Sequence, residues 1–441
     1  MNTSFTLNRR TLLTAMVGTA GAATLAACNS ADGGTDDTGD APVTLQVWGG
    51  VPAETGPDDV IAAFQEEYPH ITVIYTRYVN DDTGNVKLDS SLQGGVPIDL
   101  FFSYGVGRIT TRAESGLMAD LTELVSADED LSRFGPEADP MANYVYDGKV
   151  YCVPAALSPQ MVFVNVDAIE QAGIEISPDW DVAEYRDVAR QLSADGVYGS
   201  FGAPTIARPT LGPNALYNED GTASSYTDPI WREDMQLRVD MQEEGSALPM
   251  ETILAEKLTD FPHQAFISGR VSMITAQAFL LRYISDRAEF PHDFITRCLP
   301  QPAPTSGEEY WNGGAHGDQL AISSASENQE AAWTFLKFWV TQGGEHMLKG
   351  GRLPSIIPED TSALAGELLG ENAEELYDVQ SFEDVLFGRE VKVPIDTITV
   401  AARELEDIAE TLTTSALLGD LTVDQWVTEI TAQSDAAIAQ G

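Results

Sequence analysis

The first residue of this chain with an evident chemical use is Cys28, which ends the tetrapeptide Leu25-Ala26-Ala27-Cys28. A basic pair, Arg9-Arg10, and an apolar run from Thr11 to Ala27 precede it, an order that is typical of an export signal. The run is shorter than the ~20 apolar residues that a membrane-spanning helix needs. A thiol at this position is a site for attached acyl chains, two of which give stable membrane anchoring. We therefore predict that residues 1–27 are removed and that Cys28 is lipidated; the alternative is an ordinary secretory leader.

The flanks of Cys28 agree with this prediction. Residues 8–13 resemble a twin-arginine signal, which exports proteins that have already folded. Residues 28–42 contain Gly, Asp and Thr and almost no apolar side chain, so they predict a flexible acidic linker. We expect the protein at the cell surface, tethered to the outer face of the cytoplasmic membrane and touching it through the lipid anchor alone.

Catalytic and metal-binding patterns are missing from the rest of the sequence. No zinc-protease, nucleophile-elbow or phosphate-loop motif is present. The five histidines are scattered, and the spacing of Cys152 and Cys298 fits no metal motif. With 69 acidic residues, a pair of carboxylates carries no information about catalysis. We predict a protein that is not an enzyme and holds no metal or cofactor.

The charge of the chain excludes several kinds of partner. Only 24 basic residues balance the 69 acidic ones, which gives a formal net charge of -45. Such a chain repels nucleic acid and anionic lipid head groups. Dense negative charge also keeps a protein soluble in concentrated salt, where repulsion is screened within a few Å. We therefore suspect a salt-loving source; a merely acidic secreted protein is the alternative.

The elements after the linker predict an α/β fold. Residues 43–48 and 71–75 alternate apolar and polar side chains as strands do, and residues 98–102 form a third apolar strand. Helices with one apolar face lie between them, which is the pattern of a parallel sheet with covering helices. Further along, Asp147-Gly148 predicts a hairpin turn, and residues 161–165, 271–274 and 319–322 predict further strands.

An ordered series of short segments across the mature chain resembles one family. The most specific segment is residues 147–154, Asp-Gly-Lys-Val-Tyr-Cys-Val-Pro. It stands in order with the other segments, namely residues 45–48, 94–100, 115–121, 163–165, 172–174, 177–180, 269–273 and 331–338. Two depart slightly from the family pattern, because Ile98 is inserted before Asp99 and Asp179 precedes Trp180. Together they resemble the type 1 extracellular solute-binding proteins, the sugar-binding lipoproteins of ABC importers with the maltose-binding-protein fold.

The resemblance implies a type II periplasmic-binding-protein fold with two α/β lobes and hinge strands that cross between them. It assigns residues 43–152 and 302–344 to lobe 1, and residues 153–301 and 345–441 to lobe 2. Cys152 and Cys298 would then lie near crossing strands, where they would either form a disulfide or remain two small buried side chains.

The resemblance also implies a solute between the lobes, held by residues at strand ends. A sugar offers an apolar face to aromatic rings and hydroxyls to polar side chains. The candidates that follow strands or precede them are Trp48, Asp81, Asp82, Ser103, Tyr104, Gln277, Phe279, Trp311, Asn312, His316 and Arg352. The alternatives are core packing for Trp48 and Trp311, and solvated charges for Asp81 and Asp82.

The expected function is therefore a monomeric receptor that captures a sugar or oligosaccharide and delivers it to an ABC permease. Arg108 and Arg112 near Tyr104 keep an organic acid open as the solute, and extra acids would suit a polyamine. An anchored carbohydrate-active enzyme is the remaining alternative.

Overall fold

The computed structural model describes residues 41–138, 143–259, 261–358, 360–361, 363–370 and 372–441. The expected export signal, Cys28 and the linker up to residue 40 lie outside these ranges. Residues Ala41–Gly441 form one compact unit. Among the described helices, none has both the length and the apolar composition needed to cross a bilayer.

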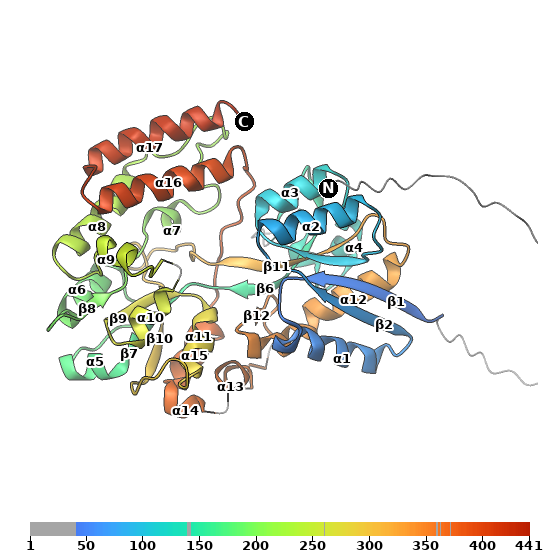
Figure 1. The fold of residues 1–441 in the computed structure, drawn as a ribbon, viewed down its shortest axis with the longest axis horizontal. Coiled ribbons are helices and arrows are strands. Elements are labelled where there is room, and N and C mark those ends of the chain that lie inside the picture. Colours follow the sequence, from blue (N-terminus) through green and yellow to red (C-terminus); the bar gives the residue numbers. More distant parts are fainter. Residues whose placement is uncertain (1–40, 139–142, 260, 359, 362, 371) are drawn as a thin grey trace, which may run out of the picture. The chain divides into compact units, whose positions relative to one another are not determined.

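The first large sheet has six strands in the order β12-β6-β11-β3-β1-β2 (Figure 1). Its amino-terminal part confirms the predicted alternation, with β1 (Val43–Gly49), α1 (Pro57–Glu67), β2 (Ile71–Arg77), α2 (Asp82–Gln93) and β3 (Leu100–Ser103). β1 pairs in parallel with both β2 and β3. Antiparallel pairing adds three later strands, β6 (Val153–Ser158), β11 (Ala315–Ile322) and β12 (Leu353–Pro354).

Helices cover both faces of this sheet. Successive side chains of a strand point to opposite faces, so each face presents apolar residues that the helices bury. Leu100 and Phe102 belong to one core with α1 and α12 (Gln329–Thr341). Phe101 belongs to a second core with Leu88 of α2 and Ile109 of α3 (Val106–Glu114). The smaller elements of this half are η1 (Ala53–Thr55), α4 (Thr122–Ala127), η2 (Ser132–Phe134) and η4 (Gly343–Gly350).

The predicted turn at Asp147-Gly148 is confirmed. It joins β4 (Val145–Tyr146) to β5 (Lys149–Val150), which pair antiparallel. The φ angles of Asp147 and Gly148 are 50° and 71°, and tight two-residue hairpins require positive φ at both positions.

The second large sheet has four strands in the order β10-β7-β9-β8. They are β7 (Met161–Asn165), β8 (Tyr198–Ser200), β9 (Val271–Ala276) and β10 (Thr296–Pro300). Val162 and Val164 pack with α5 (Val166–Ala172) and α6 (Val182–Leu192). Phe163 points to the other face, toward α10 (Pro262–Ile267), α11 (Leu281–Ser285), α13 (Leu364–Leu369) and α15 (Val379–Leu386). The short elements η3 (Ala278–Leu280) and α14 (Ala373–Leu376) lie beside these.

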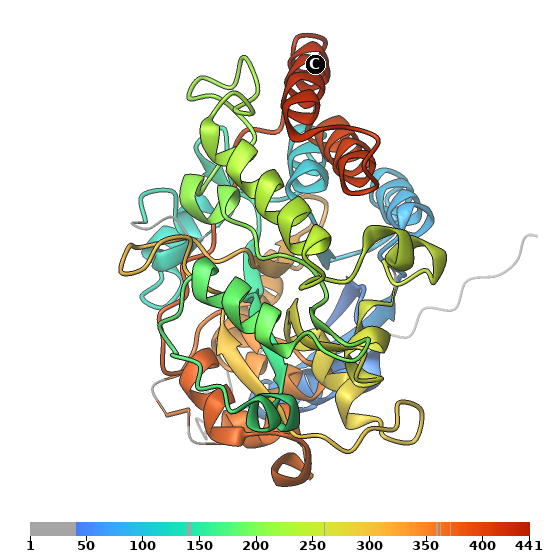
Figure 2. The ribbon, with the colours of Figure 1, turned by 90° about the vertical axis from the view of Figure 1, so that its left-hand side faces the viewer.

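A group of helices adjoins the second sheet. α16 (Ala402–Leu417) and α17 (Val423–Ile438) lie side by side next to α8 (Pro229–Glu243), with α7 (Ala207–Leu211) and α9 (Met250–Ala255) nearby (Figures 1 and 2). Tyr226, Trp231 and Trp426 form an aromatic cluster in their shared core. Residues 200–226 contain α7 but no long element.

The chain passes between the two sheets at positions that differ from the prediction. β6 and β12 were expected in lobe 2, but both pair within the first sheet. The first crossing is therefore residues 159–160, between β6 and β7, and the second is residues 301–314, between β10 and β11. A third passage follows Pro354. The local strand pattern of residues 153–158 does not reveal which sheet they join.

Cys152 and Cys298 are both free, so of the two alternatives stated for them the structure has two buried side chains and no disulfide. Cys152 lies in the core that contains Phe101, whereas Cys298 lies opposite Phe163 in the second sheet. Burial raises the pKa of the Cys152 thiol to about 12 and that of Cys298 well above its usual value. Both behave as small core side chains.

Candidate functional site

Four aromatic side chains gather where the parallel strands of the first sheet end; we call Trp48, Tyr75, Tyr78 and Tyr104 the aromatic edge. The carboxyl ends of parallel strands meet at one edge of a sheet, which is where open α/β sheets bind ligands. The rings of Tyr78 and Tyr104 are 6.3 Å apart. Trp48 is half-buried, and the Nζ of Lys87 lies 5.4 Å from its ring. The predicted candidates Trp48 and Tyr104 are thus neighbours of two tyrosines that the sequence analysis did not select.

Two glycines at the end of β1 make room for these rings. A Cβ on Gly49 would lie 2.3 Å from the Oη of Tyr75, and one on Gly50 would lie 2.8 Å from the Oη of Tyr104. Both contacts are far below van der Waals distance. The backbone N–H of Gly50 instead donates to the Oη of Tyr104 at 3.0 Å. The Gly49-Gly50 pair therefore fixes both tyrosines against the backbone.

An ion pair lies behind the aromatic edge. Arg352 Nε donates to Asp318 Oδ2 at 2.7 Å, and the Asp318 side chain is only 9% exposed. Burial raises the pKa of Asp318 above its usual value, and Arg352 opposes this rise. The negative charge of Asp318 in turn raises the pKa values of Tyr75 and Tyr104, for which burial is the larger cause. Arg352 was predicted and Asp318 was not, because the predicted strand began at residue 319.

Three other predicted residues have structural partners in the first sheet's half. Asp81 Oδ1 accepts from the N–H of Gly84 at 2.7 Å and caps α2. Asp82 is exposed and pairs with Arg108 at 2.8 Å. Ser103 is fully buried, and its Oγ accepts from Arg112 Nη1 at 2.7 Å. These contacts do not bring Asp81, Asp82 or Ser103 to the aromatic edge.

Arg108 and Arg112 were the two residues for which an organic acid remained an alternative solute, and both have partners in the structure. Arg112 is 2% exposed and donates also to Asp89 at 2.7 Å and Asn85 at 2.9 Å. It therefore joins α3 to α2 and β3 inside one core. Arg108 is engaged by Asp82 and by Asn80. Neither guanidinium is free to form an anion site.

The second sheet contributes residues that follow β9. Gln277 is half-buried, and Phe279 is 37% exposed. The carbonyl of Ala278 approaches Gly351, next to Arg352, since a Cβ at Gly351 would lie 3.2 Å from it. Gln277 and Phe279 thus lie close to the segment that carries the Asp318–Arg352 pair.

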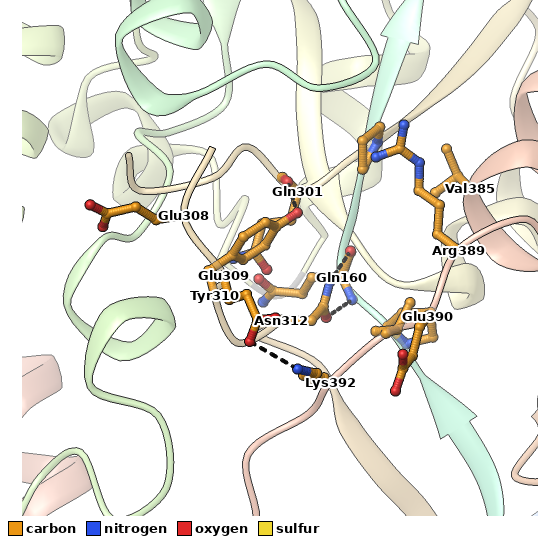
Figure 3. Close-up of a pocket in the computed structure, with 13 residues that line it drawn as sticks. Gln160, Gln301, Glu308, Glu309, Tyr310, Asn312, Val385, Arg389, Glu390 and Lys392 are labelled. Atoms are coloured by element: carbon orange, nitrogen blue, oxygen red, sulfur yellow. Dashed lines mark hydrogen bonds and ion pairs between the residues drawn. The ribbon is translucent and has the colours of Figure 1, made fainter. Parts of the chain in front are cut away.

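The remaining candidates lie in the second crossing and at the start of β11. The Trp311 ring packs on Gly212, where a Cβ would lie 2.3 Å from its Nε1. Asn312 is buried and binds the backbone of Gln160 (Figure 3). His316 lies edge-on to Phe134 at 6.2 Å, and burial lowers its pKa to about 4. Trp311 and His316 together line a cavity of about 490 Å³.

The arrangement offers aromatic faces and hydrogen-bonding groups. Within the described ranges, no group of three or more His, Cys, Asp or Glu side chains is placed to hold a metal ion. A sequence profile described as bacterial extracellular solute-binding protein matches residues 51–345, which is more than half of the chain. The chain belongs to this family. A solute-binding protein of this kind acts outside the cytoplasm.

Solved structures agree with the family. A sugar transporter from Rhizobium etli in an open conformation has a TM-score of 0.72 at 18% identity, covering 89% of this chain and 99% of its own. The sugar-binding protein MalE from Xanthomonas citri has a TM-score of 0.70 at 17% identity, covering 90% and 98%. An ABC substrate-binding protein from Listeria monocytogenes in complex with cycloalternan has a TM-score of 0.66 at 19% identity, covering 90% and 99%. These likenesses confirm the predicted two-lobe type II fold. No curated protein matches the sequence of this solute-binding protein.

Proposed function

We propose that this solute-binding protein captures a sugar or oligosaccharide between its lobes and delivers it unchanged to an ABC permease. The observation that carries this proposal is the aromatic edge beside the Asp318–Arg352 pair. Flat aromatic faces suit the C–H face of a sugar ring, and a carboxylate beside a guanidinium suits its hydroxyls. The sugar-related solved structures with the same fold support this choice.

Two alternative solutes fit less well. An organic acid would require free cationic side chains, but Arg108 and Arg112 are committed to partners on α2 and β3. A polyamine would require unpaired acids beside the aromatic edge, and Asp318 already has Arg352 as its counter-ion. An enzyme would need a paired acid and base, and the aromatic edge has no such pair among the residues described.

The proposal includes the site of action. Cys28 carries the lipid anchor after export through the twin-arginine route, and the acidic linker up to residue 42 holds a monomer outside the membrane. A Cys28→Ser variant is expected to appear in the medium, while the parent chain stays with the membrane fraction. Release of both forms to the same extent would contradict the anchor.

A thermal-shift screen tests solute binding. A ligand that binds only the folded state raises the unfolding midpoint by an amount set by RT ln(1 + [L]/Kd). We expect neutral mono- or oligosaccharides to raise the midpoint and to be recovered intact by chromatography. Stabilisation by charged non-sugars alone, or appearance of cleaved sugar, would contradict the proposal.

Two variants locate the binding site. Trp48→Leu removes the half-buried indole ring from the aromatic edge and is expected to weaken sugar binding at least about tenfold, equivalent to ~1.4 kcal/mol. Tyr146→Phe is the control, because it keeps the ring and removes only a hydroxyl whose hydrogen bond goes to Glu114. If Trp48→Leu and the parent chain bind the sugar with equal affinity, the aromatic edge is not part of the binding site.

A further inference from the structure

A separate pocket of about 400 Å³ lies over the two crossings between the sheets (Figure 3). Its floor is formed by Pro159 and Gln160 of the first crossing, by Pro300 at the end of β10 and by Gln301 of the second crossing. Residues 308–310 and Asn312 form one wall, and residues 389–392 form the other. Its size falls within the range of small-molecule sites.

This pocket is distinct from the aromatic edge. None of Trp48, Tyr75, Tyr104, Asp318 or Arg352 lines it. It adjoins β10, the edge strand of the second sheet, and Val385 of α15, which packs on that strand. Gln277 and Phe279, by contrast, follow β9, on the far side of β7.

The floor of the pocket contains a hydrogen-bond donor without a partner. Gln301 is 3% exposed, and its Oε1 accepts from the N–H of Gly313 at 2.7 Å. Within the part of the chain that the structure describes, its Nε2 has no partner. A buried donor without a partner destabilises the folded protein, so an acceptor atom that bonds to it is favoured.

The rim of the pocket supplies the complementary acceptors. Both cations of the rim are already paired, Lys392 with Glu309 at 3.1 Å and Arg389 with Asp179 at 3.0 Å. Among the described residues, Glu308 and Glu390 have no ion-pair partner, so the rim retains two free carboxylates. These repel an anion and accept hydrogen bonds from hydroxyl groups.

The lining of the pocket also has apolar groups and one aromatic ring. Pro159, Pro300, Val385 and Val391 present C–H groups, and the half-buried ring of Tyr310 lies over Gln301, to whose carbonyl its Oη donates at 2.7 Å. A hydroxyl group both accepts and donates hydrogen bonds. It can therefore accept from the free amide N–H of Gln301 in the floor and donate to the carboxylates of the rim. We propose that this crossing pocket is a second binding site, for a small neutral polyhydroxylated molecule such as a polyol or monosaccharide.

Fluorine NMR on the full chain, with its tyrosines replaced by 3-fluorotyrosine, tests this site directly. The Tyr310 resonance is identified by its loss in Tyr310→Phe, and the Tyr104 resonance by its loss in Tyr104→Phe. We expect D-sorbitol or myo-inositol to shift the Tyr310 resonance with saturation, and succinate to leave it in place. A Tyr310 resonance that does not move, or that responds only to succinate, would overturn the proposal.

Variants separate the pocket from general effects of added polyol. Gln301→Glu keeps the acceptor for Gly313 and replaces the free donor by an oxygen, so at least tenfold weaker binding is expected. Because a buried substitution can impair folding, Glu308→Gln with Glu390→Gln provides a second test at exposed positions, with at least threefold weaker binding expected. Glu374→Gln with Glu375→Gln, also exposed, is the matched control and should bind as the parent does. Unchanged affinity in both pocket variants would overturn the proposal, whatever ligand the aromatic edge binds.

Discussion

Asn312 and Gln160 hold the two crossings together through a reciprocal pair of hydrogen bonds. The Oδ1 of Asn312 accepts from the backbone N–H of Gln160 at 2.7 Å, and its Nδ2 donates to the carbonyl of Gln160 at 2.9 Å. The same Oδ1 accepts from Gly314 at 2.8 Å, and the Asn312 N–H donates to the carbonyl of Lys392 at 2.7 Å. One buried amide thus links three segments that lie 80 or more residues apart in the chain.

This geometry predicts a large effect of Asn312→Asp on stability. The substitution keeps the acceptor but removes the donor, so the carbonyl of Gln160 then faces a buried carboxylate oxygen. We expect the free energy of unfolding to fall by about 1–3 kcal/mol, measured by urea denaturation at neutral pH. Asn372→Asp, at an exposed position without a cap hydrogen bond, should change it by less than about 0.5 kcal/mol. Equal effects of the two substitutions would mean that the hydrogen bonds of Asn312 between the crossings do not stabilise the fold.

Arg352→Met is expected to destabilise the protein through Asp318. The substitution leaves a carboxylate that is 9% exposed without its counter-ion, and breaking a buried pair in this way costs up to about 3–5 kcal/mol. Since the Arg352 side chain is 30% exposed, we expect a loss nearer to ~2 kcal/mol in urea denaturation. The control is Arg108→Met, whose partner Asp82 is 76% exposed, with a loss of at most about 1 kcal/mol. A loss for Arg352→Met no larger than the control's would show that Asp318 is adequately hydrated.

Gly49→Ala tests the close packing at the end of β1. The new Cβ would meet the Oη of Tyr75 and the ring of Phe102, at 2.3 and 2.9 Å. We expect a loss of about 1–3 kcal/mol in stability and weaker sugar binding, because Tyr75 must move away from its contact with Val51. Gly107→Ala in α3 has no atom within 4 Å of its new Cβ and should raise stability by up to about 1 kcal/mol. Calorimetric melting of both variants distinguishes overpacking from a general effect of Gly→Ala.

The parts of the fold that the sequence predicted are those determined locally. The alternation of residues 43–48 and the Asp147-Gly148 turn specify strand and hairpin through neighbouring residues alone. The sheet to which β6 belongs depends on pairing with β11, some 160 residues later, and no local pattern contains that information. The order of family segments supplied the two-lobe architecture, but not the exact crossing points.

The candidate site shows the same limit at the level of side chains. Trp48 and Tyr104 were predicted because they lie at strand ends. That criterion does not show in which direction the side chains of the adjacent residues point. Ser103 follows the same strand as Tyr104, yet its hydroxyl is buried against Arg112. Asp81 caps a helix, a role that its position three residues before Gly84 allows but that competes with ligand binding. Asp318 was missed because the predicted strand began at residue 319, whereas β11 extends back to Ala315.

The net charge of -45 predicts that added salt stabilises the protein. Screening shortens the repulsion among carboxylates, with a Debye length of about 10 Å at 0.1 M and about 3 Å at 1 M. We expect the melting midpoint at pH 7 to rise steadily from 0.05 to 1 M NaCl, and equally in KCl, because screening depends on ionic strength. At pH 4, where part of the carboxylates are protonated, the rise should be smaller. A midpoint that is flat or falls with salt at pH 7 would show that self-repulsion does not limit stability.

His316 makes stability depend on pH below neutrality. Burial lowers its pKa in the folded protein to about 4, from an ordinary value of 6.5. Between these values the unfolded chain binds more protons than the folded one, so stability rises with pH across this window and falls as pH drops from 6.5 to 4. The difference corresponds to about 3 kcal/mol at pH 4.

The variant His316→Gln isolates this contribution, because glutamine does not titrate. We expect its free energy of unfolding to lie below that of the parent at pH 7, and the gap to close or reverse toward pH 4, in urea denaturation at constant ionic strength. His346→Gln, at an exposed position, is the matched control and should keep a constant difference from the parent. If the His316→Gln difference is also constant from pH 7 to pH 4, the imidazole is hydrated in the folded protein and its contact with Phe134 does not exclude water.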